Sequence, residues 1–298
     1  MIRRRGTAVA TALLLAALAA AGCGLGPGAD VGAVQLTVTR EFGAVPVLDR
    51  SLAAKESDTV MRLLEGEADV ETRYGGGFVH SIDGVAEEQR GGDPYDWFFY
   101  VDGVESQVGA AEVELEGGER VWWDYRNWSA TNHVPAVVGS WPAPFEGARQ
   151  PVSLECEGGG VACDEVREAL EGEGVTVVSG EPEKAIRVLV GTWDRLRRDP
   201  TARLIEEGPA ESGVYADFQG GGLVGLDEGG ADAQSFSPGT GLLAATSRYG
   251  GLPVWVVTGA TPAAVRSAAE ALDAENLRDH YAVAIENGKS TPLPLEGR

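Results

Sequence analysis

Two short stretches rich in aromatic residues constrain the fold of this chain more than any other feature of its sequence. Residues 97–101 are WFFYV, and residues 120–126 are RVWWDYR. Aromatic and β-branched residues favour strands, and the Asp102–Gly103 pair that follows the first stretch is typical of a two-residue hairpin turn. The sequence therefore predicts that both stretches are strands of one sheet.

The two faces of these strands differ in chemistry because side chains alternate along a strand. On the first strand Trp97, Phe99 and Val101 oppose Phe98 and Tyr100, and on the second Val121, Trp123 and Tyr125 oppose Trp122, Asp124 and Arg126. We expect a helix at residues 60–64 to cover one face, which leaves large rings on the other. A surplus of exposed aromatic side chains marks a binding surface.

The candidate ligand-binding surface is therefore the face that carries Trp122. Its candidate residues are Phe78, Phe98, Tyr100, Trp122, Asp124, Arg126 and Trp128. Two alternatives stay open. The rings could instead be buried against Trp128, Trp141 and the second half of the chain. Asp124 and Arg126, two residues apart on one face, either hold a polar ligand or form a structural ion pair at a sheet edge.

The remaining patterns divide the chain into two halves. The first half has predicted strands at residues 34–39, 44–48 and 78–82, an edge strand at 111–115, and a helix near 60–64 that Ser57 or Asp58 would cap. Residues 129–150 combine prolines with aromatic residues and are expected to form a structured connector. From residue 151 onward strands and helices alternate, which favours an α/β domain.

Three stretches of the first half together resemble one protein family. They are GGGFVHSIDG at residues 75–84, DWFFYVDGVES at residues 96–106 and GGERVWWDYRNW at residues 117–128. This pattern is similar to the transcobalamin-like C-terminal domain family, a β-grasp-like domain of unknown function in bacterial proteins, although Glu119 stands where the family often has Asp. In vitamin B12 carriers the related domain forms one wall of the cobalamin site. A corrinoid is therefore a candidate ligand, but this chain contains nothing like the α-helical barrel that forms the other wall.

With this resemblance the predicted fold class is α+β. A small β-grasp-like mixed sheet with one helix is expected over residues 33–128. It is followed by the connector at residues 129–150 and by an α/β domain of unrecognised family at residues 151–298.

The N-terminus has the pattern of an export signal. Residues 1–5 contain three arginines, residues 6–22 are uncharged and rich in Ala and Leu, and Cys23 follows. This pattern is typical of a secretory signal, and the residues before Cys23 resemble a bacterial lipobox, in which the cysteine is lipidated. We predict a lipoprotein signal peptide at residues 1–22 and a Gly-rich tether at residues 23–32. The mature protein would then be lipid-anchored on the extracytoplasmic face of the bacterial cell membrane. Ordinary secretion is the alternative.

The other two cysteines suit an oxidising compartment. Cys156 and Cys163 are seven positions apart across a Gly-rich segment. A local disulfide is expected, since an even pair remains once Cys23 carries lipid. A metal site is the alternative, but none of the three histidines lies at ligand spacing from this pair, so no metal site is predicted.

Charge and motifs limit the function further. The chain has 24 Lys+Arg against 46 Asp+Glu, a net charge of −22, which argues against a nucleic-acid partner. No G-x-S-x-G or H-E-x-x-H motif is present, so no enzyme activity is predicted. The expected function is that of a non-catalytic, membrane-anchored binding protein that captures a small ligand, with a corrinoid as one candidate, for an importer. The alternative is a cell-surface interaction module that binds a protein or a cell-wall polymer.

Overall fold

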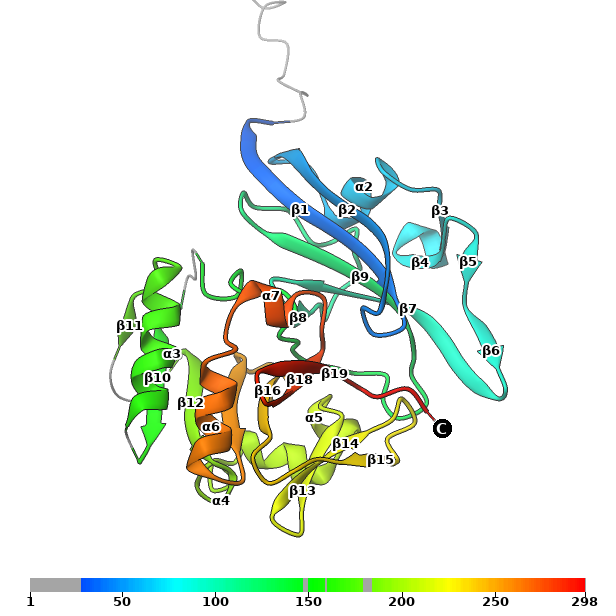
Figure 1. Ribbon diagram of the computed structural model, residues 1–298. Helices are drawn as coiled ribbons and strands as arrows, with labels where there is room; N and C mark the ends of the chain where they lie inside the picture. Colours follow the sequence, from blue (N-terminus) through cyan, green and yellow to red (C-terminus); the bar gives the residue numbers. More distant parts are fainter. Residues whose placement is uncertain (1–27, 147–149, 159, 179–183, 298) are drawn as a thin grey trace, which may run out of the picture.

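The computed structural model describes residues 28–146, 150–158, 160–178 and 184–297 and shows two bodies, each built round a sheet (Figure 1). The predicted signal peptide and residues 23–27 of the predicted tether, including Cys23, lie outside the described residues. The upper body holds the first half of the chain and the lower body the second. The predicted α+β class is confirmed.

The upper body contains the predicted aromatic strands. Its main sheet has the order β2-β1-β9-β7-β6, with β8 beside β7. The strands are β1 (Asp30–Arg40), β2 (Val45–Lys55), β6 (Glu88–Arg90), β7 (Asp93–Val101), β8 (Val104–Glu105) and β9 (Arg120–Asn127). A smaller sheet consists of β3 (Val70–Arg73), β4 (Phe78–Ile82) and β5 (Val85–Ala86), with the 3-10 turn η1 (Tyr74–Gly76) between β3 and β4. β1 and β9 are parallel neighbours at the centre of the main sheet, and β7 is antiparallel to β9.

One face of this sheet packs on helix α2 (Val60–Glu65), as predicted. The core between them contains Val60 and Leu64 from the helix together with Trp97, Trp123 and Tyr125 from the strands. The N-cap is Thr59, whose Oγ1 accepts a hydrogen bond from Arg62 N at 3.3 Å, and not Ser57 or Asp58.

The predicted edge strand at residues 111–115 is wrong. Apart from one isolated bridge between Glu114 and Thr59, the segment pairs with no strand among the described residues. One carbonyl of this segment and that of the preceding residue bind the start of α2 instead, because Val60 N donates to Val113 O and Met61 N to Ala110 O, both at 3.0 Å. The free N–H groups of a first helical turn need such acceptors.

The lower body is a mixed sheet with the order β11-β10-β12-β17-β16-β18-β19. Its strands are β10 (Val152–Glu157), β11 (Val177–Val178), β12 (Ile186–Thr192), β16 (Gly241–Thr246), β17 (Val254–Gly259), β18 (Ala282–Glu286) and β19 (Lys289–Leu293). The strands from β11 to β17 are parallel, and the remainder are antiparallel. The buried strands β16 and β17 are almost continuously apolar, as expected for strands covered on both faces.

Two layers cover this sheet. One contains α3 (Val161–Gly172) and α6 (Pro262–Ala269), which begins at the predicted N-cap Thr261. The other contains α4 (Trp193–Leu196), η2 (Ala202–Glu207), α5 (Pro209–Ser212) and a small sheet of β13 (Ala216–Gln219), β14 (Gly222–Leu226) and β15 (Asp232–Ser235). Helix α7 (Ala274–Leu277) precedes β18. The Cys156–Cys163 disulfide joins the end of β10 to the first turn of α3, with 5.9 Å between the Cα atoms.

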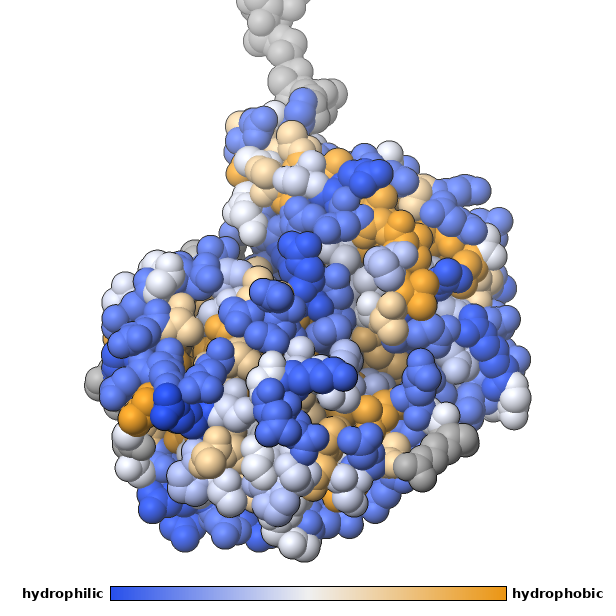
Figure 2. All heavy atoms as spheres, in the orientation of Figure 1, coloured by the Kyte–Doolittle hydropathy of each residue, from blue (hydrophilic) through white to orange (hydrophobic). Residues whose placement is uncertain are grey.

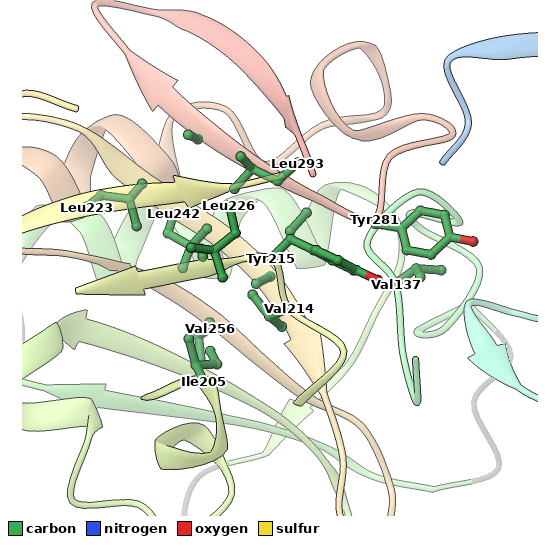
Figure 3. Packing of buried hydrophobic residues seen from close by; sticks show 14 of the residues in the cluster. Val137, Ile205, Val214, Tyr215, Leu223, Leu226, Leu242, Val256, Tyr281 and Leu293 are labelled. Atoms are coloured by element: carbon green, nitrogen blue, oxygen red, sulfur yellow. The ribbon is translucent and has the colours of Figure 1, made fainter. Parts of the chain in front are cut away.

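The connector packs into the lower body. Trp141 and Phe145 lie in the same core as Trp255 of β17, at ring distances of 5.9 and 5.0 Å. Val134 and Val137 belong to a second core that reaches both bodies. Figure 3 shows part of this core, from Leu226 and Leu242 to Tyr281. Among the described residues, no helix has the length and apolar character needed to cross a membrane.

Candidate functional site

The face of the upper sheet that carries Trp122 is closed. Tyr100, Trp122, Asp124 and Arg126 are each 0% exposed and lie where the two bodies meet. For these four residues the expectation of an open ligand surface is wrong in this structure. Burial against the second half of the chain, the alternative that the sequence left open, describes them instead.

Tyr281 is the centre of this contact. Its ring lies 5.4 Å from that of Trp122 and 5.7 Å from that of Tyr100. Its hydroxyl donates to Asp124 Oδ2 at 3.0 Å and accepts from Tyr100 at 3.3 Å. Thr39 Oγ1 donates to Asp124 Oδ1 at 2.6 Å and accepts from Trp122 Nε1 at 2.7 Å. Burial raises the pKa of Asp124 to about 6, and these hydrogen bonds oppose that rise.

Asp124 and Arg126 do not form an ion pair with each other, which was one of the two alternatives that the sequence left open for them. The Arg126 guanidinium lies 3.7 Å from the ring centre of Phe98 and donates to Thr131 O at 2.9 Å. Its nearest carboxylate is Glu105, at 4.0 Å. Glu105 also contacts His133 Nδ1 and accepts from Val134 N, so the buried charge is shared among several groups. The hydrogen bond to Glu105 raises the pKa of His133.

An opening remains at the edge of the sheet, where β7 lacks a partner. On the side away from β9, β7 pairs with β6 up to Tyr95 and with β8 from Tyr100. Within the described residues, the segment between them, residues 96–99, has no strand beside it. After β8 the chain turns at Ser106, whose hydroxyl donates to Val108 O at 2.9 Å and accepts from Val108 N at 3.3 Å. This local turn directs the following loop away from the sheet.

A cleft of about 300 Å³ opens at this gap in the pairing. We call it the edge cleft. Its walls come from β4, from residues 96–99 of β7 and from the loop at residues 105–110, with Trp123 also lining it. Phe99 stacks on Trp123 with 4.7 Å between ring centres. The two loops approach closely at Gly77 and Gly109, since a Cβ on Gly109 would lie 2.8 Å from Gly77 O.

Exposed apolar side chains surround the edge cleft. Phe78 is 38% exposed and Val108 is 51% exposed, and both line it. Tyr74 is 87% exposed and its ring lies 6.1 Å from that of Phe78. Tyr74 has a φ of +54°, a conformation that a bulky residue rarely adopts and that is concentrated at functional sites. Figure 2 shows apolar residues gathered on the upper body, over the region where β2, α2 and β4 lie in Figure 1.

The polar groups of the edge cleft are acidic or neutral. Asp96 Oδ1 accepts from Trp97 N at 2.8 Å, and burial raises the pKa of this carboxyl. Glu105 also lines the edge cleft, but its carboxylate already contacts His133 and Arg126. The cleft therefore combines aromatic walls with a few polar groups, as small-molecule sites do.

A second cleft, of about 680 Å³, lies in the lower body at the carboxyl ends of β10 and β12. Gly158 and Thr192 line it, next to the strand-to-helix segment that the disulfide braces. Its charged groups have both signs: Glu157 and Arg195 line it with Arg266, which forms ion pairs with two neighbouring glutamates. Such a mixture favours neither an anion nor a cation.

The predicted site residues are thus separated in space. Phe78 and Phe98 line the edge cleft, and Trp128, 37% exposed, lines a different hollow beside Glu88 and Tyr95. Sequence reasoning missed the contribution of Trp123 and the loop around Val108. Strand alternation predicts that Trp123 faces the core, and it does lie there, but it also lines the edge cleft.

Comparison with known proteins concerns the upper body. Residues 57–127 match the family model described as Domain of unknown function (DUF4430). Among solved structures, one match is a crystal structure described as a candidate metal-binding protein from Ruminococcus gnavus ATCC 29149. It is 15% identical with a TM-score of 0.26, and the match covers 32% of this chain and 97% of that one. No curated protein matches the chain. Among the described residues, no cluster of three or more His, Cys, Asp or Glu could hold a metal ion.

Proposed function

We propose that the protein, whose residues 57–127 match a domain of unknown function, is a non-catalytic, lipid-anchored extracytoplasmic binding protein that takes a small ligand in the edge cleft. The observation that carries the proposal is the cleft itself, a hollow of about 300 Å³ with aromatic walls at an unpaired strand edge. Both faces of the central strand β9 are buried, so a ligand cannot reach the aromatic strands through β9 and the unpaired edge of β7 is the open approach to them. The acidic net charge favours a neutral or cationic ligand.

Only a peripheral side group of a corrinoid would fit in the edge cleft. A corrin ring is larger than the edge cleft, so a corrinoid would insert a side group and leave its ring on the exposed side chains of Tyr74, Phe78 and Val108. Ligands small enough to enter the cleft completely suit it better. Cobalamin and cobinamide therefore belong in the ligand screen as its large members.

The test is a thermal-shift screen of small metabolites on the parent protein and two variants. A ligand at about 100 times its dissociation constant should stabilise the parent by about 2.7 kcal/mol. Phe78→Ala should reduce the shift, since Phe78 lines the edge cleft. Tyr249→Ala is the matched control, because Tyr249 is an aromatic residue 89% exposed on the lower body. A screen without any shift, or shifts that Phe78→Ala leaves unchanged, would refute the proposal.

The exposed rim supports a second candidate function, that of a module that binds a cell-envelope polymer or protein. Tyr74, Phe78 and Val108 form an apolar surface outside the cleft proper. Two results together would favour this second function. Purified cell-wall polymer should pull down the parent protein but not the Tyr74→Ala variant, and no small molecule should raise the melting temperature in the screen.

A further inference from the structure

The edge cleft exposes a specific part of the β7 backbone. Along β7 the peptide groups of alternate residues face opposite sides. Asp102 N donates to Arg120 O at 2.9 Å, and Trp128 N donates to Pro94 O at 3.0 Å, so the even-numbered residues face β9. The peptide groups of Trp97 and Phe99 therefore face the edge cleft.

Two of these groups are already used. Trp97 N donates to Asp96 Oδ1 at 2.8 Å, and Phe99 O accepts from Ser106 N at 3.4 Å. The Trp97 carbonyl and the Phe99 N–H have no hydrogen-bond partner within residues 28–146 or the other described parts of the chain. One acceptor and one donor, two residues apart on a strand edge, thus face the cleft.

We infer that the edge cleft recognises one extended peptide unit, so that its ligand is a short peptide or a peptide-like amide; this inference rests on the function proposed above. A residue that adds parallel to a strand donates its N–H to one carbonyl and accepts from the N–H two residues further along. The Trp97 carbonyl and the Phe99 N–H match that pattern. Main-chain hydrogen bonds provide affinity in such additions, and side-chain pockets provide specificity.

The surroundings limit the length of the ligand. β6 ends the gap at Tyr95 and β8 ends it at Tyr100, so a long strand cannot add along β7. A peptide of two or three residues fits between them and suits a cleft of about 300 Å³. Phe78 and Val108 would contact its side chains.

The indole of Trp123 supplies a further polar group. Trp123 lines the edge cleft and is 2% exposed, and its Nε1 has no hydrogen-bond partner among the described residues. A buried N–H without an acceptor is unfavourable, so a second ligand carbonyl would stabilise it.

Amide hydrogen exchange followed by NMR on the full-length protein tests the inference at one atom. The probe is a library of N-acetylated tripeptide amides. We expect the library to slow exchange of the Phe99 N–H by about tenfold or more, the effect of one added hydrogen bond. The Phe98 and Tyr100 amides, which face β9, should not change. The same library with the central nitrogen methylated should have no effect, because the donor to Trp97 O is lost.

The outcomes separate this inference from the proposed function. Tripeptides that bind while Phe99 exchange stays unchanged, or N-methylated peptides that bind equally well, would overturn the peptide inference. If no tripeptide protects Phe99 but another small ligand binds and Phe78→Ala abolishes that binding, the inference is wrong and the proposed function stands. If neither class binds, both are wrong.

Discussion

Replacing Trp122 with alanine should destabilise the whole protein, because this side chain lies between the two bodies. Trp122 is 0% exposed, packs on Tyr100 and Tyr281, and donates its Nε1–H to Thr39. A buried Trp→Ala change costs about 3–5 kcal/mol through lost contacts and the cavity, and the lost hydrogen bond adds about 1 kcal/mol. The expected loss is therefore about 4–6 kcal/mol, a large part of the roughly 5–15 kcal/mol that holds a protein folded.

Urea unfolding measures this loss. With a slope of roughly 3 kcal/mol per molar urea for a chain of this size, the midpoint should fall by about 1.3–2 M. Trp123→Ala should cost a similar amount from the opposite face, whereas Trp128→Ala, at a side chain 37% exposed, should cost about 1 kcal/mol or less. The reasoning is refuted if Trp122→Ala is as stable as the parent while Trp123→Ala is strongly destabilised. The sheet face that carries Trp122 would then be open, and the two bodies would not pack as described.

Three further predictions concern charge, the disulfide and the anchor. Burial raises the pKa of Asp102 from 3.8 to about 7, so the folded state keeps a proton that the unfolded chain has released and stability falls as pH rises from about 4 to 7. Asp102→Asn should abolish this loss and raise stability by about 2 kcal/mol at pH 8 but little at pH 4. Thermal melts at the two pH values measure this difference, and equal effects at both would contradict a raised pKa of Asp102. Replacing Cys156 and Cys163 together with Ser should cost about 2–3 kcal/mol in urea unfolding, the amount expected for so short a loop, and no loss would mean that the bond does not form. Cys23→Ser should move the protein from the membrane fraction to the soluble fraction, and processed protein that still pellets would contradict lipidation at Cys23.

The sequence predicts the aromatic strands and the division of their faces because both depend on local rules. Alternation along a strand places Trp123 with the helix and Trp122 on the other face, and the structure confirms this. Alternation does not say what covers a face. The partner of Trp122 is Tyr281, a residue 159 positions away in the chain, and no local pattern links them.

The edge cleft could not be predicted for a related reason. It exists because β6 and β8 stop short of each other along β7, and strand ends are the least certain part of a sequence prediction. The segment after β8 alternates apolar and acidic residues, which is typical of a strand. Its carbonyls serve helix α2 instead, and this use becomes visible only when both segments are placed in space.

The two edges of the upper sheet show why the edge cleft suits a short ligand. An unpaired edge strand invites other strands to add to it, and proteins protect such edges with charges. β2 carries Asp49, Arg50 and Lys55 along its open edge. The gap at residues 96–99 is mainly aromatic and lacks such a row of charges. It is protected against strand addition because it is short, since β6 and β8 on either side leave no room for a further strand. An edge that excludes a strand but leaves one carbonyl and one N–H open can still accept a single peptide unit.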